Sequence, residues 1–140
     1  MKEFEFIEHT ADIGVRVYGR SLEELFTHAA TALFSIILDY KPQQLKSKEI
    51  ELEASTLEDL FVIWLNELIS GFFADKFLPA DYRIEIKDAP NKKILKVRLR
   101  GQDFNPYENK ISAEVKAATY HNLKIEKVDK GYKVEVIFDV

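Results

Sequence analysis

One stretch of this chain largely determines its architecture: residues 55–73, which read STLEDLFVIWLNELISGFF. The stretch opens on a helix-capping signal, because Ser55 and Thr56 precede the acidic residues Glu58 and Asp59. Apolar residues then recur at spacings of three and four, as they do along one face of a helix. They form a single stripe: Leu57, Leu60, Phe61, Trp64, Leu65, Leu68, Ile69 and Phe72. Pro79 prevents the helix from continuing, so the pattern predicts one long amphipathic helix that ends before it.

A second helix is predicted nearer the N-terminus, where residues 21–24 (SLEE) form a capping box. Its apolar stripe ends near Asp39 and consists of Leu22, Leu25, Phe26, Ala29, Leu33, Phe34 and Ile37. Around the two helices, alternation of apolar and polar residues predicts strands. These strands cover residues 2–8, 12–19, 49–54, 81–88 and 92–101, and a terminal hairpin of 123–128 and 132–138 that turns at 129–131. Residues 111–120 fit a strand and a helix equally well.

The order of these elements contains a repeat of architecture. Residues 47–101 read strand, helix, strand, strand, and residues 12–39 together with 123–138 read the same. If the first unit is inserted into the second, the first and last strands lie in the same sheet. We therefore predict an α+β fold of two nested strand-helix-strand-strand units within a single domain, residues 1–140. The two long amphipathic helices pack on mainly antiparallel sheets.

Composition excludes several classes of function. The net charge of −4 argues against a protein that binds nucleic acid mainly by counterion release. The chain has no cysteine, which excludes disulfides, thiolate zinc sites and cysteine nucleophiles. It also has no nucleophile-elbow, phosphate-loop or dinucleotide-binding motif, so we do not expect an enzyme of the common motif-bearing classes. No apolar run is long enough to span a bilayer, so we expect a cytoplasmic protein with no membrane partner.

Two aspartates near the chain ends are the strongest candidates for chemistry. Asp12 and Asp139 each have the opposite phase to the apolar residues of their strands, and the same phase rule turns Ile137 outward. With the terminal carboxylate of Val140 they would form a cluster of hard oxygens, which suits Ca²⁺ or Mg²⁺. His9 could orient a ligand from behind. The alternative is that Asp12 is a turn residue, Asp139 a solvated tail and His9 an ordinary strand-end histidine.

Basic residues offer two further candidates. Lys96, Arg98 and Arg100 alternate with apolar residues along the strand 92–101, so they share one face. That stripe could contact RNA phosphates or an acidic partner, although a solvated face of an antiparallel sheet explains it equally well. From spacing alone, Lys116 is an exposed lysine paired with Glu114 or Glu108.

Several motifs, spread over essentially the whole chain, resemble those of the archease family. The resemblance begins with residues 8–14 (EHTADIG) and continues through 21–26 (SLEELF) and 32–34 (ALF). It resumes at 64–68 (WLNEL) and 114–121 (EVKAATYH), and it ends with 138–140 (FDV). These motifs match in order, in spacing and in position relative to the termini.

The resemblance implies a function that the residues alone do not. Archeases are accessory proteins of the RtcB-type RNA ligase, which joins tRNA halves using GTP and a metal. By this resemblance the chain promotes guanylylation of the ligase and its multiple turnover, and it reaches tRNA only through the ligase. The family's metal-binding positions fall on Asp12, Asp139 and Val140, with Ca²⁺ the usual cation and Mg²⁺ or Mn²⁺ as alternatives. Lys116 matches a lysine required for activation.

Three other functions remain open at the level of sequence. A metal-dependent hydrolase would need a base and an open metal position. A direct RNA-binding module would use the basic stripe, and its binding would depend strongly on salt. A general chaperone, or a modulator of RNA-modifying enzymes, would act on several client proteins.

Overall fold

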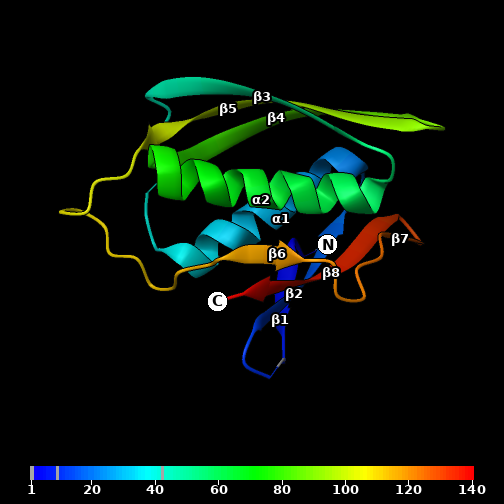
Figure 1. The fold of residues 1–140 in the computed structure, drawn as a ribbon, viewed down its shortest axis with the longest axis horizontal. Coiled ribbons are helices and arrows are strands. Elements are labelled where there is room, and N and C mark those ends of the chain that lie inside the picture. The colour runs from blue at the N-terminus through cyan, green and yellow to red at the C-terminus, as the bar shows by residue number, and fades with distance from the viewer. Residues whose placement is uncertain (1, 9, 42) are drawn as a thin grey trace.

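A computed structural model of the chain describes residues 2–8, 10–41 and 43–140. Two helices lie between two sheets, so the fold has three layers (Figure 1). Each helix contacts strands of both sheets, and the core fills the two spaces between helices and sheets. The predicted α+β class with mainly antiparallel sheets is confirmed. None of the helices formed by the described residues is both long and apolar enough to cross a bilayer.

The first sheet joins the two ends of the chain. Its path runs through β1 (Phe4–Ile7), β2 (Ile13–Gly19), β8 (Gly131–Asp139) and β6 (Ala117–Thr119), and β7 (Glu126–Val128) also pairs with β8. All these pairings are antiparallel. The pairing of β2 with β8 confirms that the predicted strands 12–19 and 132–138 share a sheet.

The second sheet comes from the middle of the chain. Its order is β3 (Lys46–Ala54), β5 (Lys92–Asp103) and β4 (Phe77–Ala89), again antiparallel. Strand β4 begins four residues before the predicted 81–88, directly after the second helix. A bulge between Pro79 and Asp81 accommodates the proline, which lacks an N–H group and is tolerated on an edge strand.

Both helices start where their capping signals predict. Helix α1 (Leu22–Ile37) begins after Ser21, whose hydroxyl accepts a hydrogen bond from the Glu24 amide at 3.1 Å. Helix α2 (Leu57–Asp75) begins after Thr56, whose hydroxyl accepts from the Asp59 amide at 3.0 Å. Each helix also carries two acidic residues in its first turn, where their negative charges interact favourably with the positive end of the helix dipole.

Helix α2 ends in a left-handed residue and occupies the centre of the core. Lys76 takes a φ of 60° there, which turns the chain directly into β4. The stripe predicted for this helix is mostly buried, and Trp64, with 0% of its surface exposed, donates its Nε1–H to the Phe26 carbonyl at 3.0 Å. One hydrogen bond therefore joins the two helices inside the core.

The connection between β5 and β6 is mostly irregular. Of the ambiguous residues 111–120, only Ala117–Thr119 form a strand, and none forms a helix. The Ser112 and Ala113 amides both donate to the Ile37 carbonyl, at 2.7 and 3.3 Å, so the end of α1 holds this segment. Tertiary contacts rather than local periodicity fix its path.

Candidate functional site

The register of β2 and β8 brings the two end aspartates together. Ile13 lies opposite Phe138, so Asp12, one residue before it, adjoins Asp139, one residue after its partner. Both side chains have the opposite phase to these core residues and lie on the face turned away from the helices. Figure 1 shows the C-terminus leaving β8 at this end of the sheet. Two carboxylates and the terminal carboxylate therefore share one end of the fold.

One neighbour on this face, Ile137, has the outward phase that the sequence predicts but is not exposed. Only 7% of its surface is accessible. It lies opposite Gly14 of β2 and Thr119 of β6, in the middle of the sheet. A hollow of about 210 Å³ beside it is lined by Ile7, Glu8, His121, Asn122, Glu135 and Ile137. Side chains of neighbouring strands and of the following loop thus cover Ile137 from the outside.

The backbone before Asp12 adopts an uncommon conformation. Ala11 has a φ of 69°, in the left-handed region that a residue with a Cβ rarely occupies. This turn directs the chain into β2 with Asp12 half-buried at its start. A hollow of about 650 Å³ opens next to it and is lined by Phe6, Ile7, Glu8, Thr10, Asp12, Ile13 and Gly14. The predicted orienting residue, His9, lies outside the described residues.

Lys116 belongs to the same end of the molecule. Its amide donates to the Asp139 carbonyl at 2.8 Å, which fixes its backbone beside the last residues of β8. The side chain is exposed, and within the described part of the chain no carboxylate lies within 4 Å of it. The predicted ion pairs with Glu114 or Glu108 are therefore not formed. The structure fixes the Lys116 backbone beside Asp139 and leaves its side chain exposed.

Two polar side chains of α2 hold β6, the strand that follows Lys116, and the segment that leads from β6 to β7. The Asn66 side chain accepts from the Ala118 amide at 2.8 Å and donates to the Ala118 carbonyl at 3.3 Å. Glu58 accepts from the Ile125 amide at 3.0 Å. Asn66 thus offers Ala118 the donor and acceptor that a neighbouring strand would provide. Sequence reasoning missed this contact, because a polar residue on a helix normally indicates a solvent-facing position.

The oxygen donors at this end match the chemistry of a hard cation but do not form a complete cage. Asp12, Asp139 and the carboxylate of Val140 are oxygen ligands of the kind that Ca²⁺ and Mg²⁺ prefer. Among the described residues there is no cluster of three or more His, Asp or Glu side chains that could hold a metal. Six or more ligands are usual for these cations. Among the described residues, this end therefore supplies only part of the ligand set of such a cation.

Charges on the same outer face form a network around Arg16. Its guanidinium contacts Glu5 at 3.1 Å and Glu135 at 2.8 Å, one on each neighbouring strand. The Tyr18 hydroxyl donates to Glu5 at 2.6 Å. This hydrogen bond, with those from Lys2 and Arg16, lowers the pKa of Glu5 to about 2. The network ties β1, β2 and β8 together next to the end that carries Asp12.

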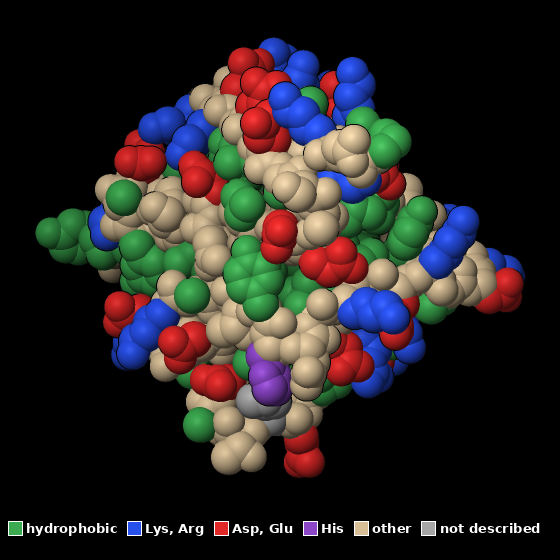
Figure 2. Space-filling view, turned by 45° about the vertical axis from the view of Figure 1, so that its right-hand side comes forward, with side chains coloured by type: hydrophobic (Ala, Val, Ile, Leu, Met, Phe, Trp, Pro, Cys, Tyr) green, Lys and Arg blue, Asp and Glu red, His purple; other side chains and the backbone are tan. Residues whose placement is uncertain are grey.

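The basic stripe of β5 lies on the far side of the molecule, on the outer face of the other sheet. Arg98 pairs with Glu49 at 2.8 Å, and the Lys96 ammonium lies 3.8 Å from Glu51. Arg100 lies opposite Ser47 and Asp81. Figure 2 shows basic and acidic side chains interspersed over this part of the surface. The structure therefore does not bring the stripe near Asp12 and Asp139, and it places carboxylates beside it.

Comparison with known proteins gives one consistent result over the whole chain. A model of the Archease protein family (MTH1598/TM1083) matches residues 4–140. The chain belongs to the archease family. The sequence resemblance is thereby confirmed, and it covers the Asp12, Lys116 and Asp139 segments alike.

Individual archeases match along nearly their full length. The chain is 36% identical to the protein archease of Methanosarcina acetivorans over 141 residues, covering 99% of this chain and 97% of that protein. It is 38% identical to the protein archease of Pyrococcus furiosus over 132 residues, covering 94% and 93%. The solution structure of protein 1598 from Methanobacterium thermoautotrophicum superposes with a TM-score of 0.84 at 30% identity and covers 100% of both chains.

Proposed function

We propose that this archease is an accessory protein of an RtcB-type, GTP-dependent RNA ligase in tRNA splicing and RNA repair. It would promote guanylylation of the ligase and its multiple turnover, without joining RNA itself. The observation that carries this proposal is that the register of β2 and β8 and the Lys116 amide bond place Asp12, Asp139 and Lys116 at one end of an archease fold. Membership of the family supports an accessory role.

The charge arrangement supports action on a partner. Asp12, Asp139 and the terminal carboxylate would hold the cation, most simply Ca²⁺, and would leave coordination positions open for groups of the ligase. A bound cation would supply positive charge beside these carboxylates. The backbone of Lys116 is bonded to Asp139, and its exposed side chain would contact a phosphate or carboxylate of the partner. By binding the guanylylation-competent state of the ligase more tightly than other states, this end would shift the ligase towards it.

A multiple-turnover RNA-joining assay with the ligase of the same organism tests the proposal. We expect Asp12→Asn, Asp139→Asn and Lys116→Ala to abolish most of the stimulation. Asp129→Asn, in the turn between β7 and β8, is the matched control and should stimulate like wild type. Undiminished stimulation by the double variant of Asp12 and Asp139 would refute the proposal.

Cation binding is tested separately, by calorimetric titration of the isolated protein with Ca²⁺. The aspartate variants should lose the binding heat, because each removes one carboxylate charge from the site. Adding one glycine after Val140 moves the terminal carboxylate without touching either aspartate and should weaken binding as well. Wild-type heats in all three variants would show that the cation, if bound, lies elsewhere.

A further inference from the structure

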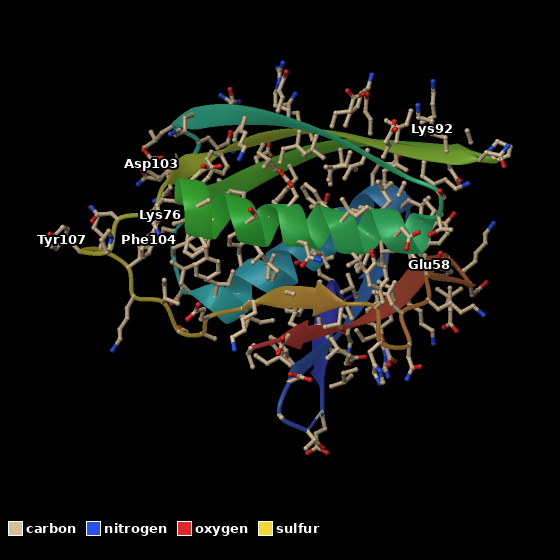
Figure 3. All side chains as sticks on the ribbon, in the orientation of Figure 1. Glu58, Lys76, Lys92, Asp103, Phe104 and Tyr107 are labelled. Carbon is tan, nitrogen blue, oxygen red and sulfur yellow. The ribbon has the colours of Figure 1, made fainter. Side chains whose placement is uncertain are left out.

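Tyr107 is the most exposed large hydrophobic residue in the described part of the chain. Its side chain is 97% exposed, and it lies in the long connection between β5 and β6. Figure 3 shows it at the tip of this connection, directed away from the body of the molecule. A tyrosine ring offers roughly 150–250 Å² of surface that a partner can cover. Single exposed apolar residues are common, so what matters is how this one is held.

A hydrogen-bonded turn holds the tyrosine in place. The Asn105 side-chain oxygen accepts from the Tyr107 amide at 2.9 Å. The Asn105 carbonyl accepts from the Glu108 and Asn109 amides at 3.1 and 3.0 Å. Pro106 fixes the backbone between them further. The turn is therefore ordered before any partner binds, which reduces the entropy lost on association.

Contacts on both sides attach this turn to the core. Before it, the Phe104 ring packs edge-on against Phe72 at 5.3 Å, and the Phe104 amide donates to the Lys76 carbonyl at 2.7 Å. After it, the Ser112 amide donates to the Ile37 carbonyl at 2.7 Å. Figure 3 shows Phe104 and Lys76 at the base of the loop whose tip carries Tyr107. The tyrosine thus projects from a rigid support.

The same connection leads directly to the candidate site. It continues from Tyr107 to Lys116, whose amide bonds to the Asp139 carbonyl. Lys116 lies nine residues after Tyr107, a stretch that spans at most about 30 Å, so one standard interface of about 800 Å² per partner is wide enough to include both.

The charge of the tip favours a protein as that partner. Residues 103–111 contain two acidic residues and one lysine, a net charge of −1. One of the acidic residues, Asp103, pairs with Lys46 at 2.8 Å. Surfaces that stack nucleic acid bases combine aromatic rings with a basic groove, and the sequence of this tip supplies no such groove. A pocket on a protein, in contrast, readily accepts a single rigid aromatic side chain.

We propose that Tyr107 is a docking anchor whose ring inserts into an apolar pocket of the protein on which the Asp12 and Asp139 end acts. This inference rests on the proposed function. It assigns separate roles to two regions. Tyr107 contributes affinity for the partner, and the end that carries Asp12, Asp139 and Lys116 activates it. Loss of Tyr107 should therefore change how tightly the archease binds but not what it does once bound.

Binding of the full-length chain to the ligase of the same organism tests the anchor, together with stimulation at saturating archease. Tyr107→Ala should raise the Kd at least about tenfold, as for a buried aromatic anchor, and leave maximal stimulation at the wild-type level. Tyr107→Phe keeps the ring and should stay within about threefold of wild type. Glu108→Ala, on the same turn, is the matched control and should bind like wild type. Because the tyrosine is exposed, the thermal midpoint of Tyr107→Ala should equal that of wild type.

The outcomes separate this inference from the proposed function. If wild type binds and stimulates the ligase while Tyr107→Ala binds equally well, only the anchor is refuted. If wild type neither binds nor stimulates, both proposals fall. If Tyr107→Phe loses as much affinity for the ligase as Tyr107→Ala, the hydroxyl rather than the ring provides the affinity. That result would refute insertion of the ring into an apolar pocket. Tyr107→Ala could instead bind the ligase like wild type but lose a salt-sensitive binding to free tRNA. That result would assign Tyr107 to RNA contact and refute the anchor.

Discussion

Replacing Asn66 with aspartate tests how α2 supports the strand next to Lys116. The side chain of Asn66 gives Ala118 one acceptor, at 2.8 Å from its amide, and one donor, at 3.3 Å from its carbonyl. Aspartate has nearly the same shape and keeps the acceptor. It replaces the donor with a carboxylate oxygen that faces the Ala118 carbonyl. The substitution therefore changes one hydrogen bond and one charge without opening a cavity.

The magnitude follows from these two changes. Loss of the hydrogen bond lowers the free energy of unfolding by about 1 kcal/mol. Leaving the Ala118 carbonyl unsatisfied against a half-buried carboxylate adds a further ~1–2 kcal/mol. We expect Asn66→Asp to be less stable than wild type by about 2–3 kcal/mol at neutral pH. A protonated aspartate can donate to the carbonyl again, so folding raises the pKa of the new carboxyl above its usual range. The deficit is then largest at neutral pH and shrinks as pH falls towards about 4.

Urea denaturation between pH 4 and 7 measures this effect, with Trp64, the single tryptophan, as the fluorescent probe. Asn66→Ala is the control, because it removes both hydrogen bonds and has no group to titrate. Its deficit relative to wild type should be similar in size at pH 7 and independent of pH. Equal stability of Asn66→Asp and wild type at pH 7, or a deficit that acid does not relieve, would refute the structural reasoning.

Two further predictions concern the same sheet. A Cβ at Gly19 would lie 2.4 Å from a backbone nitrogen of α1, whereas one at Gly14 would meet mainly a movable side-chain carbon at 2.7 Å. Gly19→Ala should therefore lower the free energy of unfolding by about 2–3 kcal/mol and Gly14→Ala by less than about 1 kcal/mol, and equal losses in urea denaturation would contradict this. Because folding lowers the pKa of Glu5 to about 2, its charged form stabilises the protein fully above about pH 4.5, and this contribution disappears as pH falls to about 2. The difference in thermal midpoint between wild type and Glu5→Gln should shrink over that range, and a constant difference would argue against the Glu5 network.

Features with a local cause were predictable from the sequence. The two helices began where Ser21 and Thr56 predicted, because a cap and an apolar stripe lie within a few residues of each other. Strands 12–19 and 132–138 paired as the nested order predicted. The meeting of Asp12 and Asp139 followed from the same pairing.

Features with a distant cause were not predictable. Residues 111–120 remained ambiguous because the groups that fix them, the Ile37 carbonyl, the Asp139 carbonyl and the Asn66 side chain, come from three other elements. The burial of Ile137 depends in the same way on its neighbours across the sheet. The strand period gave the direction of Ile137 correctly, and it gave no single prediction for residues 111–120. In both cases long-range contacts decided the outcome.

The end that carries Asp139 and the turn that carries Tyr107 depend on different parts of the fold. Asp139 faces outward only in the observed register of β8, and a slip of one residue would turn it towards the core. The burial of Val136 and Phe138, both 0% exposed, fixes that register, so the aspartate pair persists as long as the core does. The Tyr107 turn depends instead on three hydrogen bonds to Asn105 and can change without loss of global stability. Variants of the turn should therefore alter affinity at constant stability, whereas activation should be lost only through the end residues themselves or through unfolding.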